Sequence, residues 1–179
     1  MTLLAAMKQK MSSPSDLIDL GDILDLKRIE KVSKDLIIGA MNTHNEIAKS
    51  EIVNKHLPGF SELALNIADN AVRNKGTIGG AICNADPAAD YPAALLGLDA
   101  IIITNEREIN SSDFFIDMFE TSLKEEEIVI AVKLPIAKFT KYLKFASLAS
   151  KYAIVGVFVV KNELVKFSVT GASNSPFII

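Results

Sequence analysis

A cluster of glycines is the stretch of this chain most suggestive of chemistry. Gly76, Gly79 and Gly80 stand within five residues, in the order Gly-Thr-Ile-Gly-Gly. Because glycine tolerates positive φ, Gly79 and Gly80 can turn successive backbone N–H groups into a concave nest that binds phosphate oxygens, and the Thr77 hydroxyl adds a donor. The pattern is neither a Rossmann fingerprint nor a Walker loop, which disfavours classical dehydrogenases and mononucleotide kinases. Taken alone, such a segment is more often a plain tight turn.

Two acid–proline pairs follow the glycines, Asp86-Pro87 and Asp90-Tyr91-Pro92. Each proline fixes φ and each aspartate can accept hydrogen bonds from free backbone donors, so we expect a helix to begin close to Asp90. On local evidence, capping is the favoured role of Asp90. The alternative is a carboxylate that accepts a hydrogen bond from a bound ligand.

Other polar residues give weaker signals. His44 and His56 have no cysteine or paired histidine nearby, so a metal site is disfavoured and His44 is interpreted as a first-turn helix residue. Cys83 has no basic partner in the sequence and is interpreted as a small buried side chain without a redox role. The run 125–127 of three glutamates is interpreted as a solvated turn rather than a carboxylate pair for acid–base chemistry.

The composition is that of a globular chain. It has 179 residues, 49% of them hydrophobic, and a formal charge of −3. That length allows one domain, or one domain and part of a second. The single cysteine excludes an internal disulfide framework, and the absence of a basic stripe argues against nucleic acid as a partner. No apolar run approaches the roughly 20 residues of a membrane span, and the N-terminus fits a secretory signal badly, so we expect a cytoplasmic protein.

Local patterns predict the elements that must position these residues. A capping box of Thr43 and Glu46 predicts a helix start, and Pro58 predicts its end. A second helix is expected to place Phe60, Leu63, Ala64 and Ile67 on one face and to end near 69–70. A helix end is expected at Gly97 and a short helix near 111–116. Strands are predicted at 16–20, 35–41, 101–104 and 128–134, and a hairpin at 153–160 and 164–169.

The segment Thr77–Pro92 as a whole closely resembles the flavin-binding signature of the FAD subunits of molybdenum hydroxylases. The resemblance is strongest to the medium subunit of aerobic carbon monoxide dehydrogenase, and it covers essentially the whole chain. It extends to Ile38-Gly39-Ala40-Met41-Asn42-Thr43-His44, Val72-Arg73-Asn74, Phe119-Glu120-Thr121 and Tyr152-Ala153-Ile154-Val155-Gly156.

The resemblance implies an α+β fold with a mixed sheet and packed helices, the FAD-binding domain of the molybdopterin dehydrogenase (PCMH-like) type. We assign this domain to residues 1–136, with the boundary at Pro135, where the last predicted strand stops. Residues 137–179 would begin an incomplete C-terminal α+β domain.

The resemblance also implies a set of FAD contacts. The pyrophosphate would be held by the loop of Thr77, Ile78, Gly79, Gly80 and Ala81. Many members of the family have Asn at the position of Ala81, so one side-chain hydrogen bond to the cofactor would be absent here. Asp90 would bind the polar side of the flavin and Ile130 would lie against the isoalloxazine. Lys144 would approach the flavin carbonyl edge, where a cation stabilises charge on the reduced ring; its alternative is a solvated surface lysine. No catalytic or metal-ligating residue is assigned.

By the same resemblance, the chain would be an FAD-binding electron-transfer subunit. Electrons would leave a molybdenum cofactor on a large subunit, cross iron–sulfur clusters on a small subunit and reach an external acceptor through FAD. The complex would be a hetero-oligomer, a dimer of heterotrimers, and the resemblance allows its attachment to the inner face of the membrane.

Three alternatives stay open. The flavin signature alone barely separates carbon monoxide dehydrogenases from flavin subunits acting with xanthine or other N-heterocycle dehydrogenases. The family's first phosphate loop is followed by Met-Lys, which Met7-Lys8 matches, so the chain is expected to begin inside that loop, without its glycines. A truncated scaffold that no longer binds FAD is therefore a second alternative. The third is an unrelated α/β ligand-binding domain whose glycine segment is only a turn.

Overall fold

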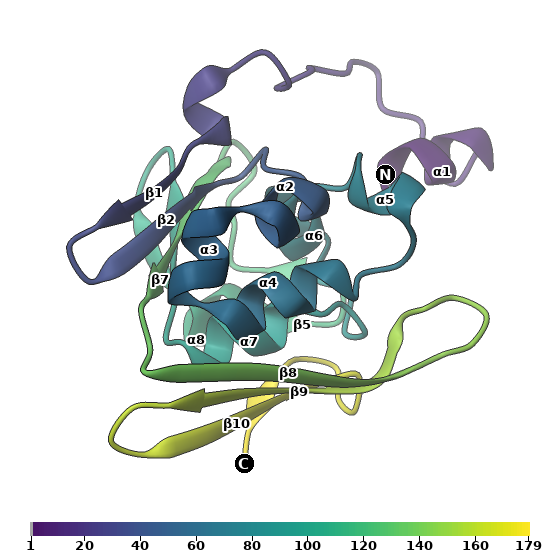
Figure 1. Ribbon diagram of the computed structural model, residues 1–179. Coiled ribbons are helices and arrows are strands. Elements are labelled where there is room, and N and C mark those ends of the chain that lie inside the picture. The colour runs from purple at the N-terminus through teal and green to yellow at the C-terminus, as the bar shows by residue number, and fades with distance from the viewer. Residues whose placement is uncertain (1) are drawn as a thin grey trace.

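The computed structural model describes residues 2–179 and contains two antiparallel sheets with helices between them (Figure 1). In the first sheet the strand order is β1-β2-β7-β3-β4, and every neighbouring pair is antiparallel. The expected α+β class is confirmed, although the strands of this sheet are not mixed in direction. The strands are β1 (Ile29–Val32), β2 (Asp35–Gly39), β3 (Ile101–Thr104), β4 (Glu108–Asn110) and β7 (Val129–Pro135).

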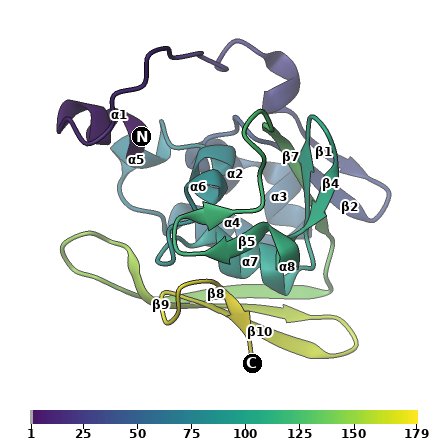
Figure 2. The ribbon, with the colours of Figure 1, turned by 180° about the vertical axis from the view of Figure 1, so that it is seen from behind.

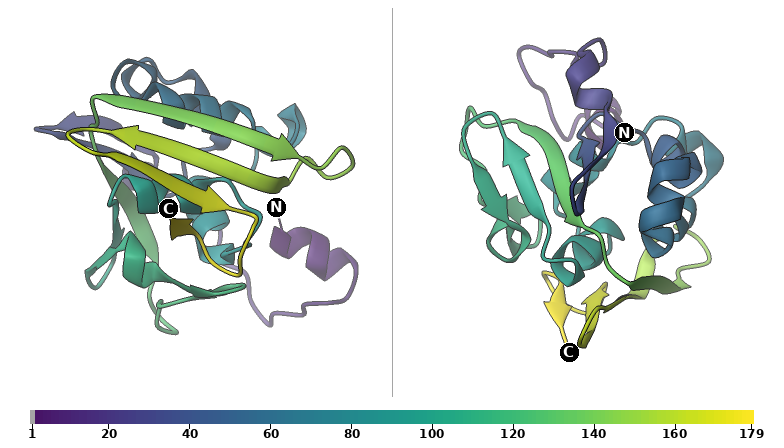
Figure 3. Two further views of the ribbon diagram at one scale, coloured as in Figure 1. Left: turned by 90° about the horizontal axis from the view of Figure 1, so that it is seen from below. Right: turned by 60° about the vertical axis from the view of Figure 1, so that its left-hand side comes forward.

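The C-terminal segment forms a second sheet with the order β11-β10-β9-β8 (Figure 3). Its strands are β8 (Phe139–Ala146), β9 (Ala153–Lys161), β10 (Val165–Thr170) and β11 (Phe177–Ile178). The β9–β10 hairpin confirms the one predicted, whereas β8 has no counterpart among the predicted strands. A two-stranded ribbon, β5 (Phe115–Asp117) with β6 (Glu120–Thr121), lies on the far side (Figure 2).

The helices are short. They are α1 (Thr2–Lys8), α2 (His44–Lys49), α3 (Glu51–His56), α4 (Pro58–Leu65), α5 (Asn70–Arg73), α6 (Ile78–Asn84), α7 (Tyr91–Gly97) and α8 (Ser111–Phe114), with a 3-10 turn η1 (Leu24–Lys27). Helices α4 and α7 lie between the two sheets, whereas α1 lies near α5 and buries none of its residues (Figures 1 and 2).

The predicted capping box is confirmed at the start of α2. The Thr43 hydroxyl accepts a hydrogen bond from the Glu46 N–H group, and the Glu46 carboxylate accepts one from the Thr43 N–H group at 2.7 Å. The helix then ends earlier than expected, because Ser50 turns the chain and caps α3 through the Val53 N–H group. Pro58 begins α4 at its first position, where a missing N–H group costs nothing. Helix α4 ends at Leu65 rather than near 69–70.

The strand predicted at 16–20 is wrong. These residues join no sheet, and Leu17 and Ile18 are 56% and 86% exposed. The Asp19 carboxylate accepts a hydrogen bond from the Gly21 N–H group at 2.8 Å, which closes a turn. Alternation of apolar and polar residues favours a strand only where a neighbouring strand offers backbone partners.

One core connects both sheets to the helices. Phe60 of α4, Tyr91 of α7 and Phe158 of β9 are wholly buried in the same cluster as Leu36 of β2. Side chains of residues 1–136 and 137–179 pack together in this core. The assignment of the two segments to separate domains remains a prediction. This shared core brings β8 close to the start of α7, where the candidate site lies.

Candidate functional site

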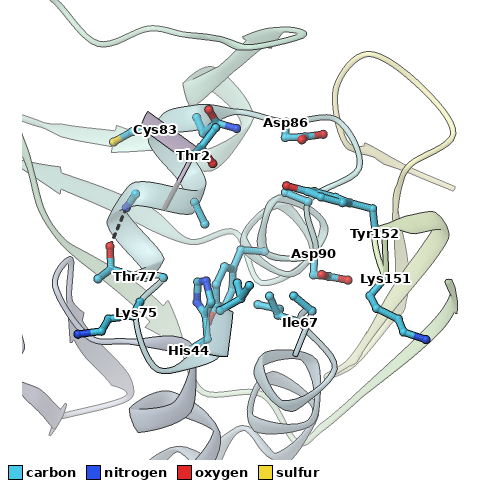
Figure 4. A pocket seen from close by; sticks show the side chains of 18 of the residues that line it. Thr2, His44, Ile67, Lys75, Thr77, Cys83, Asp86, Asp90, Lys151 and Tyr152 are labelled. Carbon is cyan, nitrogen blue, oxygen red and sulfur yellow. Dashed lines mark hydrogen bonds between the residues drawn. The ribbon is translucent and has the colours of Figure 1, made fainter. Parts of the chain in front are cut away.

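A pocket of about 680 Å³ opens where α1, α5, α6 and α7 meet the loop after β8 (Figure 4). Its size is within the range of small-molecule sites in proteins. Its wall combines the Thr77 end of α6, the Asp90 end of α7 and the Tyr152 loop, together with Ile67 and Val72. Elements far apart in the sequence thus share one cavity.

The glycine segment is the beginning of a helix. Thr77 is the N-cap of α6, and its hydroxyl accepts a hydrogen bond from the Gly80 N–H group at 3.2 Å (dashed in Figure 4). Neither Gly79 nor Gly80 has positive φ, so the expected nest is wrong. The N–H groups of Ile78 and Gly79 donate to the Asn42 and Ala40 carbonyls at 3.0 and 2.9 Å, and that of Ala81 donates within the helix. The Thr77 hydroxyl proton and the exposed backbone of Gly80 are what this segment offers a ligand.

Close packing explains why two of these positions are glycine. A Cβ atom at Gly79 would lie 2.7 Å from Ala40 Cβ and 2.8 Å from the Ala40 carbonyl oxygen, so the helix could not approach β2 as it does. A Cβ atom at Gly76 would lie 2.6 Å from His44 Nε2. At Gly80 it would meet only the Thr77 hydroxyl, at 3.1 Å. Gly79 therefore serves the fold, whereas Gly80 leaves the pocket side of α6 bare.

Asp90 does not cap α7, contrary to the local expectation. Its carboxylate has no hydrogen bond to the helix backbone and instead accepts one from the Tyr142 hydroxyl. The Lys144 ammonium lies 2.9 Å and 3.0 Å from the two carboxylate oxygens. Charge-assisted bonds of this kind outweigh a single backbone donor. Burial raises the pKa of Asp90, while Lys144 and Tyr142 act in the opposite direction.

Lys144 is not a surface lysine. Its side chain is 5% exposed, and its ammonium donates a second hydrogen bond to the Asn66 carbonyl at 3.1 Å. It lies behind Asp90 rather than in the pocket wall. Ile130 is half-buried on β7, also outside the pocket wall, and its carbonyl accepts a hydrogen bond from the Ala40 N–H group at 2.8 Å. Of the eight sequence-predicted contacts, the structure gathers Thr77, Gly80, Ala81 and Asp90 in the pocket wall and places the other four behind it or away from it.

His44 and Tyr91 form the floor of the pocket. As expected, His44 opens α2; its ring is buried, and Nδ1 lies 3.2 Å from the Tyr91 hydroxyl oxygen. Burial lowers the pKa of His44 to about 4, so the ring is neutral at physiological pH. Sequence reasoning did not assign either residue to the site, because their 47-residue separation hides the contact.

Tyr152 and Cys83 are two further pocket residues that were not assigned to the site from the sequence. The Tyr152 ring lies beside Asp86 and Asp90 in Figure 4. Tyr152 begins one of the segments that resemble the FAD subunits, and this resemblance could have indicated a place in the site. Cys83 was expected to be buried, but its side chain is exposed at the pocket. Desolvation by the surrounding protein raises the pKa of the Cys83 thiol to about 11, so the thiol is protonated at neutral pH.

The glutamate run at 125–127 is not a simple solvated turn. The side chain of Glu127 is inaccessible to solvent, lies 2.9 Å from Arg107 Nε and accepts a hydrogen bond from the Thr104 hydroxyl at 2.8 Å. Arg107 is the main cause that lowers the pKa of Glu127 to about 2. This ion pair fixes the turn before β7 and lies outside the pocket.

Two features are absent from the part of the chain that the structure describes. Between Thr2 and Ile179, no group of three His, Cys, Asp or Glu side chains is arranged to hold a metal ion. Within the same residues, no helix has the length and apolar character needed to cross a membrane.

Comparison with known proteins assigns the chain to a family. Residues 1–137 match the family described as the FAD binding domain in molybdopterin dehydrogenase, and the chain belongs to it. It is 34% identical over 164 residues to the nicotine 6-hydroxylase medium subunit of Paenarthrobacter nicotinovorans, a match that covers 89% of this chain and 58% of that subunit. It is 35% identical over 138 residues to the carbon monoxide dehydrogenase medium chain of Hydrogenophaga pseudoflava, covering 75% of this chain and 48% of that one.

A solved structure confirms the fold. The chain superposes on carbon monoxide dehydrogenase from Hydrogenophaga pseudoflava with a TM-score of 0.92 and 31% identity, over 99% of this chain and 66% of that one. The chain therefore spans about half to two thirds of the length of these relatives. Membership of an FAD-binding family removes the alternative of an unrelated α/β ligand-binding domain.

Proposed function

We propose that this chain is the FAD-binding, electron-transfer subunit of a molybdenum hydroxylase of the carbon monoxide dehydrogenase kind. The observation that carries the proposal is the pocket whose wall joins the Thr77–Ala81 segment to Asp90, in a chain of an FAD-binding family. When bound, FAD supplies the redox chemistry between the iron–sulfur clusters of a partner and an external acceptor. The chain itself supplies position and electrostatics and oxidises no substrate.

The residues present fit such a cofactor. Thr77 already accepts a hydrogen bond from Gly80, so its hydroxyl proton is available to a phosphate oxygen. Gly80 has no side chain to obstruct approach to the helix start. At the far side of the pocket, Asp90 offers a carboxylate acceptor suited to the polar side of the flavin. Ala81 gives an apolar contact in place of a side-chain hydrogen bond.

Two further contacts belong to the proposal. Lys144 is proposed to act at the flavin carbonyl edge through the Asp90 carboxylate with which it pairs, since it lies outside the pocket wall. Ile130 is proposed as an apolar neighbour of the isoalloxazine, although it lies outside the pocket wall.

The proposed partners are an iron–sulfur small subunit and a molybdopterin large subunit, assembled as a dimer of heterotrimers. The names of the relatives, medium subunit and medium chain, support a complex of several subunits. We propose a cytoplasmic location, with the complex held at the inner face of the membrane.

A second candidate is the flavin subunit of an enzyme that acts on N-heterocycles. It is favoured by the near-equal identities to the nicotine 6-hydroxylase subunit, 34%, and to the carbon monoxide dehydrogenase chain, 35%. The large subunit contacts the substrate in either case. Turnover of carbon monoxide and of N-heterocycles by the assembled complex separates the two candidates.

Titration of the purified chain with FAD tests the proposal directly. We expect saturable quenching of flavin fluorescence in the wild type and roughly fivefold to tenfold weaker binding in Thr77→Ala, since one neutral hydrogen bond contributes about 1 kcal/mol. Ser50→Ala is the matched control: Ser50 is also an N-cap whose hydroxyl accepts from an N–H group three residues on, at 3.3 Å, but it lies outside the pocket. It should bind FAD like the wild type.

Each outcome has a distinct meaning. A folded wild-type chain without FAD binding contradicts the proposal for this chain and supports the scaffold alternative. Equal weakening by Thr77→Ala and Ser50→Ala would show that lost helix caps, rather than a contact in the pocket, reduce the affinity.

A further inference from the structure

Two side chains of β8 converge on one buried carboxylate. Tyr142 and Lys144 point to the same side of the strand because they are two residues apart. The Tyr142 hydroxyl donates a hydrogen bond to Asp90 Oδ1, and the Lys144 ammonium lies 2.9 Å from Oδ1 and 3.0 Å from Oδ2. Asp90 is 5% exposed and lines the pocket. The family resemblance pointed to Asp90 and Lys144 but to no role for Tyr142.

Tyr142 is held rigidly in this position. It is 2% exposed, and its ring centroid lies 6.4 Å from that of Phe158 on the adjacent strand. Gly156 stands opposite Lys144 on β9, and any Cβ atom at Gly156 would collide with the Tyr142 hydroxyl oxygen. The absence of a side chain on β9 therefore leaves room for the hydroxyl to reach Asp90.

The Tyr142 hydroxyl also fixes the orientation of the Asp90 carboxylate, which Lys144 alone does not fix. Asp90 stands at the first turn of α7, where a free carboxylate ordinarily rotates to accept from backbone N–H groups. A phenol hydroxyl is directional, whereas an ammonium is a point charge with three rotatable donors. Lys144 can follow the carboxylate into another rotamer, and Tyr142 cannot.

We infer that Tyr142 is a positioning residue that binds the Asp90 carboxylate and holds it turned toward the pocket. Its value for FAD binding rests on the function proposed above. Its effect on Asp90 is a property of the chain without ligand, so it can be tested separately.

The test compares Tyr142→Phe with Ser168→Ala. The Ser168 hydroxyl is also buried on the C-terminal sheet and donates to the Ala93 carbonyl of α7 at 2.6 Å, but it does not touch Asp90. Both variants lose one buried hydroxyl contact between the sheet and α7. Only the first removes a donor from the carboxylate.

The first readout is the Asp90 side-chain 13C resonance, followed against pH in the ligand-free chain. The ionisable groups around Asp90 are Lys144 and Tyr142 on β8, Tyr91 beside it, and Tyr152 with Asp86 at the pocket. Removing a hydrogen bond to the charged form disfavours that form, so we expect the Asp90 pKa to rise in Tyr142→Phe and to stay unchanged in Ser168→Ala. An unchanged pKa in Tyr142→Phe overturns the inference.

The second readout is the affinity for FAD as a function of pH. The affinity should fall as Asp90 becomes protonated. Tyr142→Phe should move this fall to higher pH and weaken binding roughly tenfold at neutral pH, as expected for a hydrogen bond to a charged group. Ser168→Ala should leave both unchanged. Absence of FAD binding in the wild type would defeat the proposed function, while the resonance titration would still decide the role of Tyr142.

A second perturbation protects the test against a Tyr142→Phe chain that does not fold. Replacing Tyr142 by 3-fluorotyrosine keeps the shape and makes the hydroxyl a stronger donor. The Asp90 pKa should then fall rather than rise. A rise, or no change, would contradict the inference.

Discussion

Replacing Gly79 by alanine should destabilise the protein strongly, because Gly79 sets the distance between α6 and β2. The new Cβ atom would lie 2.7 Å from Ala40 Cβ and 2.8 Å from the Ala40 carbonyl oxygen. Overpacking of a core costs about 1 to 3 kcal/mol. The shift would also weaken the hydrogen bond from the Gly79 N–H group to the Ala40 carbonyl, now 2.9 Å long, which adds about 1 kcal/mol. The expected loss is therefore about 2 to 4 kcal/mol in the free energy of unfolding.

Urea unfolding followed by circular dichroism measures this loss, and Gly80→Ala is the control. At Gly80 the added methyl group meets only the Thr77 hydroxyl, at 3.1 Å, and faces the pocket. Its stability should stay within about 1 kcal/mol of the wild type, because alanine also favours the helix. Affinity for FAD should nevertheless decrease in Gly80→Ala. A Gly79→Ala chain as stable as the wild type would refute the argument that close packing, rather than backbone conformation, requires glycine here.

Three further results follow from the structure. Because the pKa of Glu127 is lowered to about 2, its ion pair with Arg107 contributes stability above pH 4.5 that is lost as pH falls toward 2. The difference in urea midpoint between the wild type and Glu127→Gln should therefore shrink over that range. A constant difference would contradict the pairing. Burial lowers the pKa of His44 to about 4, so stability held above pH 6.5 declines between pH 6.5 and 4, and a ring NMR titration should show no protonation near pH 6.5. Thr43→Ala removes a capping box and should cost about 1 kcal/mol in thermal or urea unfolding without altering FAD affinity; an unchanged stability would show that the cap is not needed.

Local chemistry made part of the fold predictable. The Thr43 capping box, the start of α7 near Asp90 and the hairpin of β9 and β10 follow from short-range patterns and are present in the structure. The strand predicted at 16–20 shows the limit of that approach, because a strand also requires a neighbour that sequence alternation does not reveal.

Strand β8 could not be recognised from its pattern because its polarity is inverted. Thr140 and Tyr142 face the core, while Phe139, Leu143 and Phe145 are exposed. The polar residues are accommodated by distant partners: the Thr140 hydroxyl accepts from the Gly59 N–H group at 3.0 Å, and Tyr142 donates to Asp90. A local hydrophobic pattern contains no information on partners of this kind.

The candidate site was predictable in its residue types but not in its geometry. Resemblance to the FAD subunits indicated Thr77, Gly80, Ala81 and Asp90, all of which lie in the pocket wall. It could not show that the amide groups of Ile78 and Gly79 are engaged by the carbonyls of residues 42 and 40, just after β2, or that the Asp90 carboxylate is held from β8. Both facts depend on contacts between segments that only the folded chain brings together.

The order in which the polypeptide is synthesised has a consequence for the pocket. Its Asp86–Asp90 wall is held by residues much later in the chain: Tyr142 binds Asp90 across 52 residues, and the Thr170 hydroxyl lies 2.9 Å from the Pro87 carbonyl oxygen across 83 residues. Contacts of such long sequence separation form late in folding. On the ribosome, α6 and Asp90 are translated before β8, the strand that fixes the Asp90 carboxylate. The cofactor site therefore matures only when β8 to β10 have left the exit tunnel and docked, so FAD would be captured after synthesis of the C-terminal sheet rather than during it.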